Sequence, residues 1–155
     1  MRDKNIGFIG LGNLGYNLAN SILLANYNLF IHDLNKKNAK KLIKKGAVWC
    51  EDIKCLTSKS TLIINCLPNT KAISDVFESS NGLLNFINSK HLIIECSTTD
   101  EEEMIRLSKL IKLTGSNYLE APLSGGEHRS VSGNIAVLVS GERACFKRAF
   151  PILKE

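Results

Sequence analysis

The stretch that decides the fold is residues 5–15, NIGFIGLGNLG, in which an apolar run leads into three glycines at G-x-G-x-x-G spacing. The run predicts a β-strand over residues 5–9, and the pattern after the glycines predicts a helix over residues 13–25. This spacing between a strand and a helix is typical of a loop that binds a dinucleotide. The binding residues expected in this loop are Gly10, Leu11, Gly12, Asn13, Leu14 and Gly15.

Each glycine has its own physical reason in such a loop. Gly10 permits the tight turn, Gly12 lets the backbone approach the pyrophosphate, and Gly15 lets the helix pack closely on the sheet. The phosphates would then face free N–H groups and the positive end of the helix dipole. The alternative is a glycine-rich turn that binds no ligand.

An acidic residue follows the second predicted strand, residues 28–32. Asp33 lies eighteen positions after Gly15, and its carboxylate would accept hydrogen bonds from the adenosine ribose and repel a 2′-phosphate. This favours NAD as the cofactor. Lys36 and Lys37 follow closely and would offset part of that repulsion, so NADP stays open. The alternative is that Asp33 only caps the next helix.

Short apolar runs alternate with helical patterns along the rest of the chain. Strands are predicted over residues 28–32, 47–50, 61–67, 91–96, 118–121 and 135–139. Helices are predicted over residues 35–45, 69–78, 82–88, 100–113 and 142–153. Because several strands are apolar along their whole length, they suit a parallel sheet covered on both faces. We therefore predict an α/β fold with a doubly wound, mostly parallel sheet of the Rossmann type, in one domain over residues 1–155.

The chain carries a formal net charge of +5, and much of it comes from one cluster of lysines. In a helix over residues 35–45 the lysines share one side, while Ala39, Leu42 and Ile43 form the other. No aromatic residues are interleaved with the lysines, which counts against binding of single-stranded nucleic acid. We expect a solvated helix face and no nucleic-acid partner. The lysines are Lys36, Lys37, Lys40, Lys41, Lys44 and Lys45.

The cysteines indicate a reducing compartment. Five cysteines, an odd count, stand at spacings that match no zinc or redox motif, so we expect no metal. The N-terminus shows no signal-peptide pattern, and no apolar run approaches the roughly 20 residues needed to cross a bilayer. We therefore expect a cytoplasmic chain without a membrane partner. The cysteines are Cys50, Cys55, Cys66, Cys96 and Cys145, of which Cys66 and Cys96 look like buried small apolar residues.

Five segments stand out along the chain: residues 8–15 (FIGLGNLG), 66–69 (CLPN), 95–98 (ECST), 121–126 (APLSGG) and 133–141 (GNIAVLVSG). Taken in this order, they resemble the β-hydroxyacid dehydrogenases, a family that includes 3-hydroxyisobutyrate dehydrogenase and 6-phosphogluconate dehydrogenase. The set covers essentially the whole chain and is far more specific than any single motif. Leu14 stands where the family usually has methionine, and Glu95 stands where it has aspartate.

The resemblance implies further binding residues. Leu67 and Pro68 would lie along the cofactor, and the Thr98 hydroxyl would hydrogen-bond the nicotinamide end. Substrate would bind at Ser124, Gly125 and Gly126, where a hydroxyl and two unhindered N–H groups suit a carboxylate. The alternatives are that Ser97 and Thr98 cap the acidic helix, and that residues 124–126 form a plain turn.

One departure from the family lies close to the expected substrate segment. Arg129 and Ser130 stand where the family often has glycine and alanine. Arg129 is either a contact for an acidic substrate or a surface residue. His128 beside it either titrates with a functional role or is an inert loop residue.

A larger departure is length. Family members are nearly twice as long, and their second, all-helical domain holds the catalytic lysine. No lysine here matches that motif, so the resemblance places the catalytic lysine beyond Glu155 and no catalytic residue within these 155 residues. A positioned general acid or base typically contributes about 10²–10⁴-fold. We therefore expect this chain alone to bind cofactor with weak or no turnover, and a homo-oligomer becomes possible only with the second domain.

The resemblance implies hydride transfer between a nicotinamide and a small hydroxy acid or semialdehyde. One alternative is another Rossmann reductase, of the imine or ketopantoate type. The other is a catalytically inactive module that senses a nucleotide or binds a partner.

Overall fold

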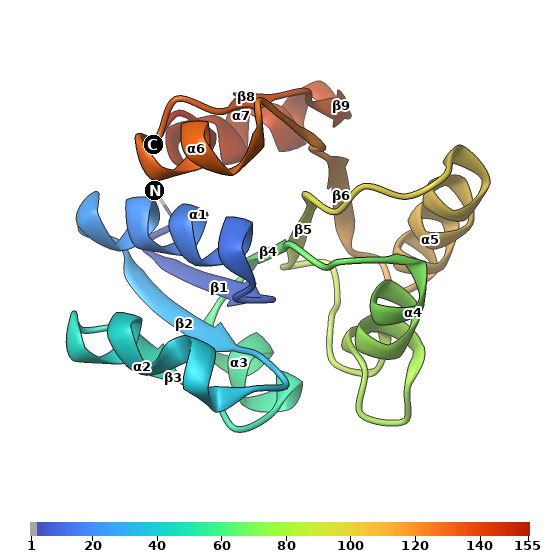
Figure 1. Cartoon of the computed structure of the whole chain (residues 1–155). Helices are drawn as coiled ribbons and strands as arrows, with labels where there is room; N and C mark the ends of the chain where they lie inside the picture. Colours follow the sequence, from blue (N-terminus) through green and yellow to red (C-terminus); the bar gives the residue numbers. More distant parts are fainter. Residues whose placement is uncertain (1–2) are drawn as a thin grey trace.

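In the computed structural model, which describes residues 3–155, a seven-stranded sheet runs through the molecule (Figure 1). Its order is β3-β2-β1-β4-β5-β6-β9, and only β9 runs antiparallel to its neighbour among these described residues. The doubly wound, mostly parallel sheet is therefore confirmed. The strands are β1 Asn5–Ile9, β2 Asn28–His32, β3 Val48–Trp49, β4 Leu62–Asn65, β5 Leu92–Glu95, β6 Asn117–Glu120 and β9 Ser140–Gly141.

Helices cover both faces of this sheet. Figure 1 shows α6 and α7 on one side and α4 and α5 on the other. The buried cluster on one face takes residues from α1, α2 and α7, and the cluster on the other takes residues from α3, α4 and α5. The helices are α1 Asn13–Leu24, α2 Lys36–Lys44, α3 Ile53–Lys59, α4 Thr70–Glu78, α5 Glu101–Leu113, α6 Gly126–Val131 and α7 Arg143–Leu153.

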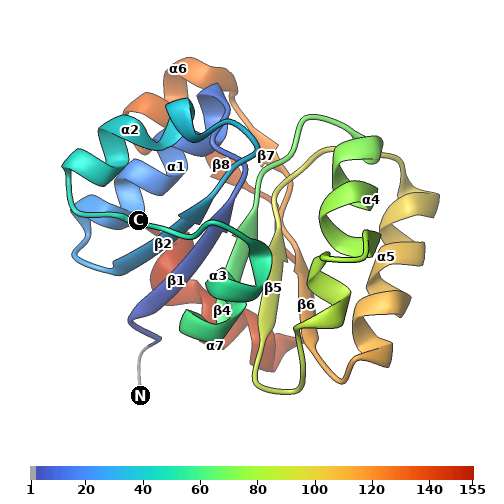
Figure 2. The same ribbon diagram turned by 90° about the horizontal axis from the view of Figure 1, so that it is seen from below.

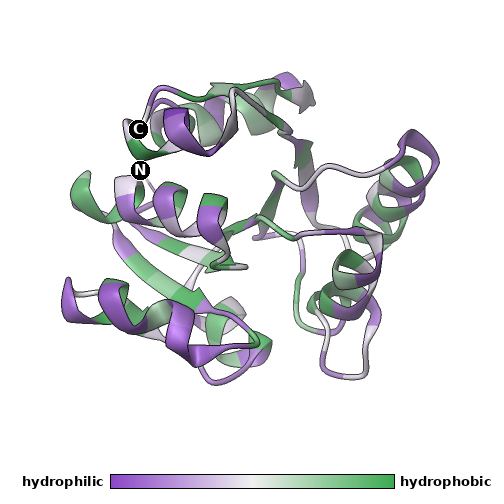
Figure 3. Ribbon diagram, viewed as in Figure 1, coloured by the Kyte–Doolittle hydropathy of each residue, from purple (hydrophilic) through white to green (hydrophobic). Residues whose placement is uncertain are grey.

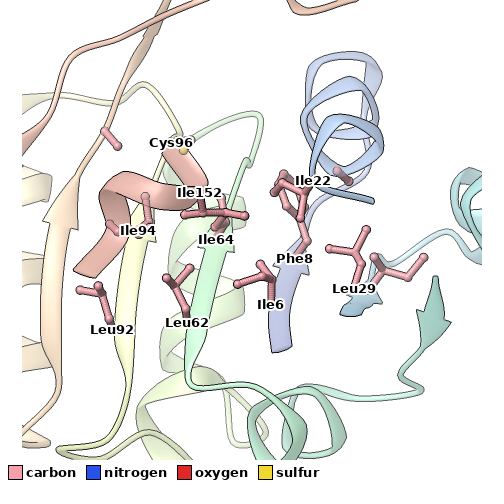
Figure 4. Packing of buried hydrophobic residues seen from close by; sticks show 14 of the residues in the cluster. Ile6, Phe8, Ile22, Leu29, Leu62, Ile64, Leu92, Ile94, Cys96 and Ile152 are labelled. Carbon is pink, nitrogen blue, oxygen red and sulfur yellow. The ribbon is translucent and has the colours of Figure 1, made fainter. Parts of the chain in front are cut away.

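The central strands β4 and β5 each have three successive apolar residues because successive side chains point to opposite, covered faces of the sheet. In β4, Ile64 packs in the cluster with α1 and α7, whereas Ile63 packs with α3, α4 and α5. Figure 4 shows Ile152 of α7 beside Ile64, and Ile22 of α1 beside Phe8 of β1. Both faces thus need a helical cover, which is the physical reason for the alternation of strands and helices.

The lysines of α2 are exposed, as predicted, and Figure 3 shows this helix largely in the hydrophilic colour. On the apolar side of the helix, Ala39 and Leu42 are buried against the sheet, whereas Ile43 is 37% exposed. Asn35 caps the helix, because its side chain accepts a hydrogen bond from the Lys37 N–H. The alternative that Asp33 caps this helix was therefore wrong.

Several short elements differ from the prediction. Helices α3 and α6 were not predicted, and residues 82–88 contain only the 3₁₀ turn η1, Leu83–Asn85. The single strand predicted over residues 135–139 was wrong. Instead, β8 (Ala136–Val137) pairs with β7 (Leu123–Ser124) in a separate two-stranded sheet, and β9 joins β6. A strand of two residues is too short to show the alternation of apolar and polar side chains, so it is recognised only by its pairing with another strand.

Within residues 3–155, no helix combines the length and the apolar character that crossing a membrane requires. All five cysteines are free thiols. Cys96 is buried as predicted, whereas Cys66 is only partly buried. The described residues hold no cluster of three or more histidine, cysteine or acidic side chains suited to a metal ion.

Candidate functional site

A pocket of about 850 Å³ opens at the carboxyl ends of β1, β2, β3 and β4. Figure 2 shows these strand ends at the edge of the sheet where β7, β8 and α6 also lie. The chain order reverses between the neighbours β1 and β4, and ligands of open parallel sheets bind at such a reversal. The lining includes most of the predicted cofactor residues: Gly10, Gly12, Asn13, Leu14, Gly15, Asp33, Leu67 and Pro68.

The three glycines of the loop differ in what surrounds them. Gly10 has a φ of +92°, and a Cβ there would overlap the carbonyl oxygen of Cys66. A Cβ on Gly15 would overlap the carbonyl oxygen of Gly10. A Cβ on Gly12 would meet nothing within 4 Å, so that atom would project into open space. Gly10 and Gly15 thus allow the loop to close on the sheet, whereas Gly12 keeps the pocket open.

The N-terminus of α1 opens into the same pocket. Gly12 is the N-cap, and within the described part of the chain no side chain caps this helix or places an acid in its first turn. The first N–H groups of a helix have no partner inside the helix and carry a partial positive charge. Here these N–H groups are left available to an anion such as a phosphate.

Asp33 holds the glycine loop from the end of β2. Its Oδ2 accepts a hydrogen bond from the backbone N–H of Leu11 at 2.6 Å. Its Oδ1 accepts from the Asn35 N–H at 2.7 Å and from the Asn38 side chain at 3.1 Å. A carboxylate has about four acceptor sites, so it retains capacity for a ligand. The Leu11 side chain is buried in the core, so this residue reaches the site through its backbone only.

The turn after β4 is fastened to the turn after β5. The Ser97 hydroxyl accepts from the backbone N–H of Leu67 at 2.8 Å, and it also bonds the carboxyl group of Glu95. The Ser97 N–H donates to the same carboxyl oxygen of Glu95 at 2.9 Å. Asp100 caps α5 by accepting from the Glu103 N–H. The alternative that Ser97 or Thr98 caps this helix was therefore wrong, and Thr98 is exposed outside the pocket lining.

Glu95 is an acid inside the core. It is fully buried, and burial raises the pKa of its carboxyl group to about 7. Its second oxygen, Oε2, and both amide atoms of Asn65 are buried without a hydrogen-bond partner among the described residues. Asn65 lies opposite Glu95 in the register of β4 and β5. Burial without a cationic partner favours the neutral form of this acid.

The predicted substrate segment lies outside this pocket, at the same end of the sheet. Ser124 ends β7, Gly125 is the N-cap of α6 with a φ of +128°, and Gly126 is the first residue of that helix with a φ of +74°. Two hydrogen bonds join α6 to α1. Asn17 donates to the Ser130 hydroxyl at 2.9 Å, and Asn13 donates to the Glu127 carboxylate at 3.3 Å.

The residues that depart from the family lie in this short helix. Ser130 is buried, and its hydroxyl also donates to the Glu127 carbonyl at 2.6 Å. Arg129 and His128 are exposed on α6. Ser130 therefore links α6 to α1, the helix that follows the glycine loop.

The sequence analysis missed Glu51, which lines the pocket near Asp33. It follows β3, and β3 pairs in parallel with β2, so the ends of the two strands meet at one edge. Glu51 forms an ion pair with Lys36 at 2.5 Å, and this partner holds the pKa of the carboxyl group below its ordinary value. The available signal was that any residue directly after a parallel strand lies at this edge.

Comparison with known proteins gives a consistent result. The family model for the NAD-binding domain of 6-phosphogluconate dehydrogenase matches residues 5–155. A probable mitochondrial 3-hydroxyisobutyrate dehydrogenase of Arabidopsis thaliana is 31% identical over 163 residues, covering 97% of this chain and 47% of the relative. The 3-hydroxyisobutyrate dehydrogenase of Pseudomonas aeruginosa is 29% identical, covering 97% of this chain and 50% of the relative.

Solved structures show the same fold. Psf3 in complex with NADP+ and 2-OPP superposes with a TM-score of 0.93 at 29% identity, over 96% of this chain and 53% of that protein. An imine reductase variant from Myxococcus stipitatus in complex with NAD+ has a TM-score of 0.89 over 99% of this chain and 52% of that one. Its identity is 17%, so that likeness shows the fold alone. The chain spans about half the length of the relatives it matches.

Proposed function

The chain belongs to the family of NAD-binding domains of 6-phosphogluconate dehydrogenase, and from that premise we propose how it holds the dinucleotide and which reaction it serves. The pyrophosphate lies against the glycine loop and the N-terminus of α1. The adenosine ribose lies at Asp33, and the nicotinamide end lies along Leu67, Pro68 and Thr98. The observation that carries this proposal is the pocket that joins the glycine loop, Asp33, Leu67 and Pro68 at one edge of the sheet.

The loop fits a dinucleotide in a way that can be tested residue by residue. The space beside Gly12 is open, so the pyrophosphate can approach the backbone there. The hydrogen bond between Asp33 and the Leu11 N–H fixes the loop before any ligand arrives. Ser97, through the Leu67 N–H, fixes the opposite wall. A preformed site of this kind needs little ordering when it binds.

The proposed reaction is hydride transfer with a small hydroxy acid or semialdehyde. The bound nicotinamide supplies or accepts the hydride. Ser124, Gly125 and Gly126 take the substrate's carboxylate, through the Ser124 hydroxyl and the unhindered N–H groups of the two glycines. The family resemblance places the lysine that moves the proton outside residues 1–155. We therefore propose that these residues alone bind cofactor with weak or no turnover.

The remaining expectations are also proposals. We propose that residues 1–155 form one domain and work in the cytoplasm, where five free thiols suit a reducing environment. The relatives named as 3-hydroxyisobutyrate dehydrogenases support a hydroxy acid as the substrate class. A homo-oligomer is proposed only for a form that carries a second domain.

The first test is thermal unfolding of the chain during titrations with NAD+ and NADH. At a ligand concentration of about 100 times the dissociation constant, binding adds about 2.7 kcal/mol of stability. Gly12→Ala should keep the melting temperature of the unliganded protein, because the new methyl group meets no protein atom within 4 Å. The same variant should lose most of the ligand-induced rise, because the methyl group projects where the pyrophosphate lies.

Leu24→Ala is the matched control. Leu24 is 69% exposed and ends the same helix that the glycine loop begins. This variant should retain the full ligand-induced rise in melting temperature. If Gly12→Ala still shows the full ligand-induced rise in melting temperature, the glycine loop is not part of the binding site. If the unsubstituted chain shows no such rise, cofactor binding by these residues is rejected.

A further inference from the structure

Two of the carboxylates that line the pocket, those of Asp33 and Glu51, lie at the ends of neighbouring strands, where the adenosine ribose is proposed to bind. Asp33 follows β2, and Glu51 follows β3. The strands pair in parallel with Ile31 opposite Trp49, so Asp33 and Glu51 each come two residues after that pair. Two further bonds hold the strand ends together. The Cys50 N–H donates to the Ile31 carbonyl at 2.9 Å, and the His32 Nδ1 lies 2.9 Å from the Cys50 carbonyl oxygen.

Lys36, the first residue of α2, pairs with one of these acids and already has two partners. Its Nζ lies 2.5 Å from Glu51 Oε1 and 5.1 Å from the centroid of the Trp49 ring. The Trp49 ring in turn lies against the His32 ring, with centroids 5.6 Å apart. The ammonium group is therefore directed toward β3, where a carboxylate and an aromatic face both attract it.

The chemistry of the two cofactors differs at this place. NADP(H) carries a 2′-phosphate with a charge near −2 at neutral pH, whereas NAD(H) carries a hydroxyl. Proteins that accept the phosphate need a free cation beside the ribose. Here the first lysine of α2 is paired with Glu51, so this ion pair leaves no free cation from Lys36 beside Asp33.

We propose that Glu51 is a specificity-determining residue that favours NAD(H) over NADP(H), because it holds Lys36 in the Glu51–Lys36–Trp49 cluster and so withholds this cation from a 2′-phosphate. This inference rests on the proposed binding of a dinucleotide with its adenosine ribose at Asp33. It adds a second acidic residue, from a different strand, to the one expected from the sequence. Removal of the Glu51 charge releases Lys36 for the phosphate.

The experiment compares the affinities of NAD+ and NADP+ for the unsubstituted chain and for Glu51→Gln, by isothermal titration calorimetry at low ionic strength. Both groups of the ion pair are exposed, with side-chain exposures of 57% for Lys36 and 74% for Glu51, so the effect is moderate. We expect Glu51→Gln to bind NADP+ about three- to tenfold more tightly, with little change for NAD+.

Two double variants identify the released cation. Glu51→Gln with Lys36→Met should lose the gain in NADP+ affinity. Glu51→Gln with Lys37→Met is the matched control, since Lys37 lies one position further along α2 without an ion pair among the described residues. This control should keep most of the gain.

The outcomes separate this inference from the proposed function. If the unsubstituted chain binds neither nucleotide, both are rejected. If NAD+ binds and Glu51→Gln leaves the ratio of the two affinities unchanged, only the selectivity inference is rejected. A gain that survives Lys36→Met would equally reject the role of Lys36.

Discussion

The glycine loop and the Ser124–Gly126 segment lie at the same end of the sheet, but the protein holds them by different means. Gly10 and Gly15 are pressed against backbone carbonyl groups, between two central strands and the first helix. Gly125 follows a two-residue strand and Gly126 begins a six-residue helix, and the atoms nearest to a Cβ there belong to the side chains of Arg129 and His128. Backbone packing therefore preforms the glycine loop, whereas side-chain hydrogen bonds position the segment that is proposed to bind substrate.

The largest expected effect compares one glycine from each region. Gly10→Ala puts a Cβ onto the Cys66 carbonyl oxygen at a φ of +92°, so we expect a loss of roughly 3 kcal/mol or more in the free energy of unfolding. Gly126→Ala also has a positive φ, but the nearest atom lies 3.6 Å away, so we expect about 1–2 kcal/mol. Urea unfolding measures both, and equal losses would contradict the difference between the two regions.

The second-largest expected effect concerns Glu95, the buried acid that bonds Ser97. Burial raises the pKa of Glu95 from 4.5 to about 7, so the unfolded chain ionises at a lower pH than the folded protein. The unfolded state releases this proton first, so Glu95 lowers stability progressively as the pH rises from about 4.5 to 7. Each unit of pKa corresponds to about 1.4 kcal/mol, which gives a total of about 3 kcal/mol above pH 7.

Glu95→Gln should remove this loss in the free energy of unfolding. The glutamine oxygen can still accept from the Ser97 N–H, and its amide group faces the register position of Asn65. Unfolding curves at pH values between 4 and 8 should show the variant gaining stability over the unsubstituted chain as the pH rises. Parallel pH profiles for the two proteins would show that Glu95 ionises normally.

The smallest expected effect tests the hydrogen bond that joins α6 to α1, next to the proposed substrate segment. Ser130→Ala leaves the partly buried Asn17 amide without its partner, so we expect a loss of about 1 kcal/mol and faster amide hydrogen exchange in α6. Exchange in β4 and β5 should stay unchanged. Ser132→Ala is the control, because that exposed hydroxyl bonds only the Arg129 carbonyl within the described structure, and its effect should stay within about 0.5 kcal/mol.

The sequence analysis succeeded where a signal is local. The glycine spacing, the acid after the second strand and the alternation of apolar strands with helices were all visible, and they led to the correct fold. It failed at α6 and at β7, β8 and β9, where the elements are too short to show a period. It also missed α3, although Asp52 provides a local cap by accepting from the Cys55 N–H.

The residues of the candidate site also fall into two groups, those that the sequence indicates and those that only the structure reveals. The residues that line the pocket from the glycine loop come from one continuous stretch, so their spacing alone indicates their role. Ser97 was considered as a helix cap, but it bonds Leu67, thirty positions earlier in the chain. Lys36 was considered as a partner for a 2′-phosphate, but it pairs with Glu51, fifteen positions later.

The sequence by itself determined the parallel sheet, the dinucleotide loop and the position of Asp33, because these depend on residues that are neighbours along the chain or repeat with a short period. Only the tertiary structure decided which groups Asp33, Ser97 and Lys36 bond, and that Leu11 faces the core. Those contacts join different strands and helices, and their geometry depends on how the strands align across the sheet. A short linear pattern contains no information about that alignment.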